Sequence, residues 1–113
     1  MSFFSKLFQP KNENSVRYKR FMANKINNRS LKYVTERDED NRDIVIGKGG
    51  AIHVRDDGQL IVYGGGSDVL FRADVDTLTC AELMSLDGVI LEGYDYEKGR
   101  ERKIVAHYLY YRK

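Results

Sequence analysis

The sequence predicts an α+β fold, mostly antiparallel β, in which one N-terminal helix packs on a curved sheet or partial barrel of about eight strands. The clearest helical hydrophobic period lies in residues 15–28, and no later segment shows one. After them, short apolar segments alternate with turn residues. The length of 113 residues, with 42 % hydrophobic and 32 % charged side chains, suits one core and not two. We therefore expect a single globular domain over residues 15–113, after an amphipathic segment and linker over residues 1–14.

The first segment carries a short apolar face at roughly helical spacing. This face consists of Phe3, Phe4, Leu7 and Phe8. A helix of this length is not stable alone in water. Pro10 and the polar residues after it interrupt any helix, because proline disfavours helical backbone in the residue before it. We expect this segment to rest on a surface.

The helix predicted over residues 15–28 has one apolar stripe at positions i, i+3, i+4 and i+8. The stripe consists of Tyr18, Phe21, Met22 and Ile26. Asn14 or Ser15 can cap the start by accepting a backbone N–H. Asn27 and Asn28 can end the helix, because asparagine tolerates the left-handed backbone of a C-cap.

Two hairpins are predicted next. The first pairs residues 31–36 with residues 43–47 across a charged turn at residues 38–41. The second pairs residues 51–55 with residues 59–63, and its Asp57-Gly58 step supplies the positive φ angles of a tight turn. The glycines at residues 64–66 then end the strand.

The last third predicts further strands at residues 69–73, 77–84, 89–94 and 102–111. Residues 78–86 also fit a short helix, because Thr77 and Thr79 favour extension whereas Ala81 to Met84 favour helix; we prefer the strand. The final strand is apolar on both faces. We expect the sheet to cover one face and the helix to cover the other.

Charge is distributed unevenly along the chain. Residues 1–34 carry +7, residues 35–97 carry −10 and residues 98–113 carry +5, within a net charge of +2. The basic ends can pack on the acidic middle inside the fold, which we favour, or can face an anionic partner.

No motif for catalysis or cofactor binding is recognisable. His53 and His107 lack the spacing of metal ligands. Cys80 is the single cysteine, and we expect it to be a small buried hydrophobic residue. The glycine clusters match neither phosphate-binding pattern and predict turns. An anion bound by Lys48 and nearby N–H groups is the alternative reading of these glycines. We expect no catalytic residue, no metal and no cofactor.

The candidates for binding are basic and aromatic residues near the two ends of the chain, together with Lys48. They are Arg17, Arg20, Lys25, Lys48, His107, Tyr108 and Tyr110. The acidic centre and a pI near 8.6 argue against nucleic acid. No apolar run reaches the roughly 20 residues of a membrane span, so at most residues 1–25 make weak peripheral contact with anionic lipid. The unpaired cysteine and the absence of a signal-peptide pattern predict a cytoplasmic location.

Two resemblances bear on the fold. The strand pattern from AIHVRDDGQLIVY through VLFRADVD and LDGVILEG to KIVAHY resembles small bacterial pleckstrin-homology or GRAM-like domains. That family closes its barrel with a C-terminal helix, whereas this chain has its helix first. The stretches YVTERD and ELMSLDGV look like small proteins of Gram-positive bacteria to which no activity is assigned. Neither resemblance carries over a functional residue; the second implies no known activity, and the resemblance shifts the expectation only toward binding.

The sequence thus predicts a non-catalytic interaction domain that engages a protein partner or itself. One alternative is a small-ligand-binding protein or enzyme whose pocket joins His53, His107, tyrosines and arginines. Another is peripheral contact with an anionic membrane through the basic N-terminal region.

Overall fold

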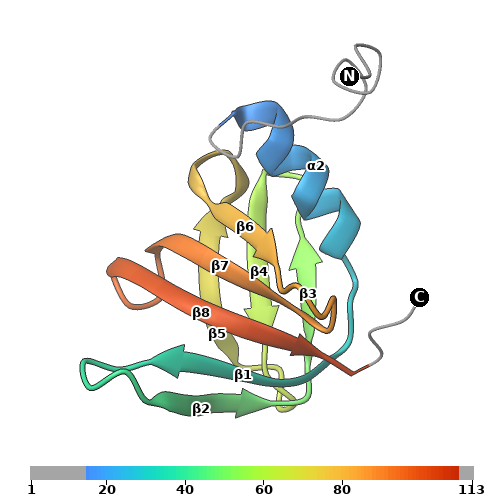
Figure 1. Cartoon of the computed structure of the whole chain (residues 1–113). Coiled ribbons are helices and arrows are strands. Elements are labelled where there is room, and N and C mark those ends of the chain that lie inside the picture. The colour runs from blue at the N-terminus through green and yellow to red at the C-terminus, as the bar shows by residue number, and fades with distance from the viewer. Residues whose placement is uncertain (1–14, 110–113) are drawn as a thin grey trace.

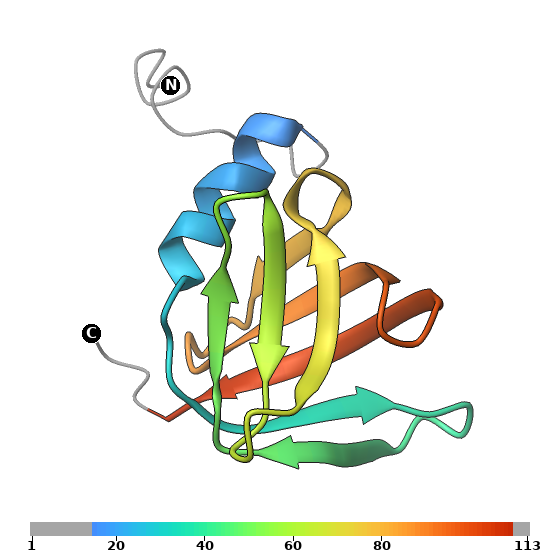
Figure 2. The ribbon, with the colours of Figure 1, turned by 180° about the vertical axis from the view of Figure 1, so that it is seen from behind.

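A computed structural model describes residues 15–109 and contains two antiparallel sheets with one helix beside them. The strands of the two sheets cross steeply, and the helix lies along one side (Figures 1 and 2). The elements are α2 (Val16–Ile26), β1 (Leu31–Arg37), β2 (Asp43–Lys48), β3 (Ala51–Val54), β4 (Gln59–Tyr63), β5 (Val69–Asp74), the 3-10 turn η1 (Val75–Thr77), β6 (Thr79–Glu82), β7 (Gly88–Asp95) and β8 (Arg100–Tyr108). One sheet has the strand order β2-β1-β8-β7-β6 and the other has the order β3-β4-β5. The predicted α+β class is confirmed, and the sheets do not close into a barrel.

The chain passes from the five-stranded to the three-stranded sheet at Gly49 and Gly50. Gly50 has φ +82°, and a Cβ atom there would lie 1.8 Å from the carbonyl oxygen of Tyr63. No side chain fits so close to a backbone oxygen, so this corner requires glycine. The predicted turn is present and lets the two sheets pack face to face.

The helix begins where the sequence predicts. The Ser15 hydroxyl accepts a hydrogen bond from the Tyr18 N–H at 3.1 Å, which satisfies a free donor of the first turn. The helix ends at Ile26, two residues earlier than expected, and Asn28 follows with φ +69°. Asparagine tolerates this left-handed backbone better than most residues.

The buried side of the helix differs from the predicted stripe. Met22, Ala23 and Ile26 are buried in the core, whereas Phe21 is 41 % exposed. Helix α2 packs on η1, β6 and β3, so its buried side faces the gap between the two sheets. Lys19 is also buried, and its Nζ donates to the Leu78 carbonyl oxygen at 3.0 Å. The predicted position of Phe21 in the core is wrong because the helix bridges two sheet edges and does not lie flat on one sheet.

Both predicted hairpins are confirmed by strand pairing of β1 with β2 and of β3 with β4. The ambiguous region at residues 78–86 contains strand β6, which pairs antiparallel with β7. Strand pairing therefore decides a region in which intrinsic propensity does not.

The final strand is covered less than expected. Ile104, Ala106 and Tyr108 on β8 are buried, whereas Val105 and His107 on the opposite face are half-buried. Helix α2 packs on η1, β6 and β3 and not on this second face. The prediction that the helix covers β8 is wrong, and this outer face of the five-stranded sheet is open to solvent around Val105.

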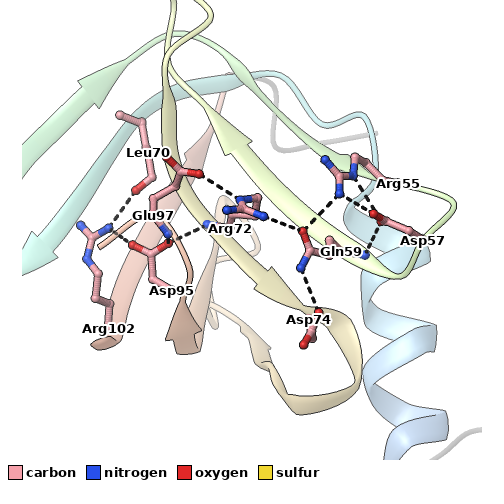
Figure 3. Close-up of polar contacts among 9 residues, drawn as sticks. All are labelled: Arg55, Asp57, Gln59, Leu70, Arg72, Asp74, Asp95, Glu97 and Arg102. Atoms are coloured by element: carbon pink, nitrogen blue, oxygen red, sulfur yellow. Dashed lines mark hydrogen bonds and ion pairs between the residues drawn. The ribbon is translucent and has the colours of Figure 1, made fainter. Parts of the chain in front are cut away.

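A buried polar network joins the two sheets on the side away from the helix. Arg102 is 5 % exposed and donates to Asp95 Oδ2 at 2.7 Å, to Glu36 Oε1 at 2.7 Å and to the Leu70 carbonyl oxygen at 2.8 Å. Asp95 also accepts the Arg72 N–H at 3.0 Å. Figure 3 shows Arg102, Asp95, Leu70 and Arg72 of this network. The network ties strands of both sheets together.

Candidate protein-interaction surface

The predicted binding residues do not gather at one place. Arg17 is exposed on the helix. Arg20 makes a paired hydrogen bond to Asp76 at 2.9 and 2.8 Å, and Lys25 lies 2.8 Å from Glu82. These two basic residues pack on the acidic middle of the chain, as the internal reading of the charge pattern predicts.

The candidates at the C-terminal end lie on opposite faces of β8. His107 stacks on Tyr33 on the outer face, with 4.4 Å between the ring centroids. Tyr108 is 3 % exposed on the inner face, and the Arg29 guanidinium lies 4.3 Å from its ring centroid. Burial raises the pKa of the Tyr108 phenol, because the charged form loses water. Tyr108 is a core residue, and Tyr110 lies outside the described residues.

Lys48 is exposed at the end of β2, and two glycine N–H groups near it, which the alternative reading of an anion site would use, are bound within the chain. The Gly65 N–H donates to the Lys48 carbonyl oxygen at 2.9 Å, and the Gly49 N–H donates to the Lys32 carbonyl oxygen at 3.0 Å. Both N–H groups therefore hold the turn together and do not point at an anion.

The polar network of Figure 3 contains carboxylates and guanidinium groups, and each is paired. Burial by itself raises the pKa of Asp95, but hydrogen bonds from Arg102, Arg72 and Glu97 outweigh it and hold this pKa below 3.8. A hydrogen bond from Arg102 likewise lowers the pKa of Glu36. Within residues 15–109, no buried side-chain nitrogen or oxygen lacks a partner. These groups have the features of a structural network.

The potential nucleophile and bases are separated. Cys80 is buried on β6, and burial raises its pKa to about 12, which leaves the thiol protonated and unreactive. His53 is exposed on β3, whereas His107 lies on β8 of the other sheet. The structure does not bring these three side chains together. In the described part of the chain, no group of three metal-ligating side chains is found.

The outer face of the five-stranded sheet carries a row of small and apolar side chains, which we call the outer row. It consists of Val45, Thr35, Val105, Ile90 and Ala81. Each residue is the direct cross-strand partner of the next, so the row crosses all five strands. Neighbouring strands lie about 4.8 Å apart, which makes the row about 19 Å long.

Exposure along the outer row is greatest at its β2 end. Val45 is 49 % exposed, Thr35 next to it is buried, and Val105, Ile90 and Ala81 are half-buried. Beside them is a hollow of about 300 Å³ whose lining includes Thr35, Leu83, Ile90, Val105 and His107. Antiparallel sheets usually place polar side chains on a solvated face, so this face departs from the usual pattern.

Charged side chains border the outer row on one side. They are Asp43 on β2, Arg37 on β1, Lys103 on β8 and Glu92 on β7; Asp43 pairs with Arg37, and Glu92 lies opposite Lys103. All four are exposed. On the other side of the row lies the stacked pair of Tyr33 and His107. The result is an apolar strip with mixed charges on one flank.

Sequence reasoning identified the apolar second face of the final strand but predicted a helix over it. The row became recognisable only when the register placed Val105 beside Thr35 and Ile90. The run Ile44-Val45-Ile46 was the available signal for its β2 end, because three consecutive apolar residues must present at least one to each face.

Comparisons with known proteins do not assign the chain to a family. No family model, curated protein or solved structure matches it. Among the described residues, no helix is long and apolar enough to cross a membrane.

Proposed function

We propose that this chain is a non-catalytic protein-interaction domain and that the outer row is its contact surface for another protein. The observation that carries the proposal is the row of mostly apolar side chains from Val45 to Ala81, with buried Thr35 between Val45 and Val105, on a partly exposed sheet face. Exposed apolar area next to polar side chains is typical of protein contact sites.

The charges beside the outer row favour a protein over an anionic polymer or membrane. Asp43 and Glu92 are acidic, whereas Arg37 and Lys103 are basic. A surface that binds phosphates needs an excess of basic groups. Mixed charges suit a partner with its own acidic and basic side chains, because complementary charges set register and specificity.

The separation of the two histidines supports binding over a catalytic pocket. A nucleophile and its base must lie within hydrogen-bond reach, and His53 and His107 are on different sheets. Cys80 is buried in the core. The groups that the enzyme alternative requires are therefore dispersed.

Site-specific photo-crosslinking in cells tests the proposal. A photoreactive phenylalanine replaces Ile90 in the outer row or, as a control, exposed His53 on β3 of the other sheet. We expect a crosslink to a different protein from position 90 and not from position 53. Adding Val105→Lys to the position-90 chain should remove that product, because it places a charge in the middle of the row.

Circular dichroism and thermal unfolding establish that each variant is folded. The proposal would be contradicted by the same crosslinked products from both positions, by the absence of a protein product from position 90, or by lipid adducts alone. Sedimentation with anionic vesicles provides the matching measurement for the membrane alternative.

A further inference from the structure

A second group of uncovered apolar side chains lies on the inner face of the β1–β2 hairpin, opposite the outer row. Glu36 is the cross-strand partner of both buried Ile104 and Ile44, so these side chains share the face that looks toward the core, because directly paired residues lie on one side of a sheet. Ile46, at the bulge of β2, packs partly against the core. The hairpin therefore carries apolar side chains on both of its faces.

The three-stranded sheet does not cover the tip of this hairpin. Figures 1 and 2, which show the chain from opposite sides, both place the tip beyond β5, an outer strand of the other sheet. Ile44 is accordingly 48 % exposed, whereas Val34, further along the inner face, is 0 % exposed. The inner face thus continues past the core as an open surface.

A hollow of about 670 Å³ lies on this open surface. Ile44 and Ile46 form its apolar part. The charged part of its lining consists of four carboxylates and two guanidinium groups, those of Glu36, Asp38, Glu39, Asp40, Arg37 and Arg100. Four negative and two positive groups leave an excess of two negative charges beside an apolar floor.

Both arginines of the hollow already have acidic partners. Arg37 Nε lies 3.2 Å from Asp43 Oδ1, and Arg100 Nη2 lies 3.8 Å from Glu36 Oε2. Their positive charge is therefore directed at these partners and does not offset the carboxylates at the tip of the hairpin.

The unpaired carboxylates of the hollow are at the turn. Glu39 and Asp40 are exposed, and within residues 15–109 neither forms an ion pair. The turn itself is fixed, because Asp38 Oδ1 accepts the N–H groups of Asp40 and Arg42, each at 2.8 Å. The described residues contain no group of three ligating side chains, so these carboxylates do not converge on a metal ion. Neighbouring carboxylates on a fixed turn suit separate cationic groups, as along a peptide.

We propose that this hollow binds a basic segment of a partner protein. One apolar side chain of the segment contacts Ile44 and Ile46, and neighbouring lysine or arginine side chains contact Glu39 and Asp40. Exposed apolar area beside charge is typical of a protein contact site, and the opposite charges select a basic sequence. Five of the eight lining residues are exposed, which suits a segment laid across the surface, since a site for a small molecule encloses most of its ligand.

This inference goes beyond the proposed function, because it uses the other face of the hairpin and a partner of defined charge. NMR titration of the isotope-labelled full-length chain tests it, with an amidated Gly-Lys-Leu-Lys-Gly peptide as the probe. One matched peptide has glutamate in place of both lysines, and another has serine in place of leucine.

We expect the lysine–leucine peptide to shift the amide signals of residues 36–46 and the glutamate peptide to leave them unchanged. The serine peptide should bind about tenfold more weakly, since it loses the burial of a leucine side chain. Higher salt should weaken binding of the lysine–leucine peptide, because exposed charges are screened.

Two variants with the same change in charge separate the hollow from the overall charge of the chain. Asp40→Lys should weaken binding of the lysine–leucine peptide about fivefold, because it replaces an attraction by a repulsion. Asp56→Lys, at another exposed aspartate in a hairpin turn, should leave binding unchanged. The spectra of the free variants show directly that each is folded.

The inference would be overturned by any of four results: no shift with the lysine–leucine peptide, equal binding of the three peptides, equal effects of the two variants, or shifts confined to the outer row. Crosslinking from position 90 is a separate measurement on the other face of the sheet, so either proposal can fail alone.

Discussion

The two sheets contact each other along two sides, which we call the apolar seam, beside the helix, and the polar seam, on the opposite side. The two seams are built from different chemistry. On the helix side, Met22 and Ile26 fill the gap with apolar side chains. On the opposite side, hydrogen bonds from Arg102 to the Leu70 carbonyl oxygen and from the Arg72 N–H to Asp95 cross between the sheets, and ion pairs of Arg102 with Asp95 and Glu36 within the five-stranded sheet hold these groups in place. An apolar seam loses stability in proportion to the volume removed, whereas a buried ion pair fails as a unit because one missing partner leaves an uncompensated charge. The polar seam should therefore be the less tolerant of substitution.

Arg102→Ala gives the largest expected effect. It leaves Asp95, which is fully buried, without its main partner, and breaking such a pair costs about 3–5 kcal/mol. Urea unfolding followed by circular dichroism measures the loss. The double variant Arg102→Met with Asp95→Asn removes both charges and should recover part of the stability. A cost below about 1 kcal/mol for Arg102→Ala would mean that the seam tolerates an unpaired carboxylate.

Met22→Ala tests the apolar seam. Met22 is 3 % exposed, and truncating a buried methionine costs about 2–5 kcal/mol in the free energy of unfolding. Phe21→Ala is the matched control at the preceding position of the same helix, because Phe21 is 41 % exposed. We expect the control to lose clearly less. Equal losses would show that the stripe predicted from sequence, and not the observed packing, describes this helix.

Acid should weaken the polar seam selectively. The pKa values of Glu36 and Asp95 are held below 4.5 and 3.8, so protonation is harder in the folded chain than in the unfolded chain. Their contribution to stability is complete above the unfolded pKa values, near pH 4, and is lost as pH falls through the folded pKa values. We expect the urea midpoint to fall over this range. The Asp95→Asn variant should have a lower urea midpoint at pH 7, and its midpoint should change less with pH. If its midpoint changed with pH as steeply as that of the unsubstituted chain, this origin of the acid sensitivity would be contradicted.

Lys25→Ala should have the smallest effect. Its pair with Glu82 bridges the helix and β6, but the lysine side chain is 46 % exposed, and surface ion pairs contribute about 0–1 kcal/mol. Thermal unfolding at low and high salt measures the difference. A loss as large as that of Met22→Ala would show that this bridge, and not apolar packing, holds the helix side together.

Local signals predicted most of the elements. The Asp57-Gly58 turn, the Ser15 cap and the left-handed Asn28 depend on a few adjacent residues, and such conformations are set by short-range sterics and hydrogen bonds. The class of the fold followed from these signals. The residues buried on the helix did not, because Phe21 and Ala23 exchange roles according to which edges the helix bridges.

By itself, the sequence determined where the helix and most strands occur, and that basic ends flank an acidic middle. Only the tertiary structure decided which apolar residues stay at the surface. Val105 and Ile104 alternate along one strand and look equivalent in sequence, but Ile104 faces the core and Val105 faces solvent. The physical reason is that burial depends on what packs against each face of a sheet, and strands distant along the chain supply that contact.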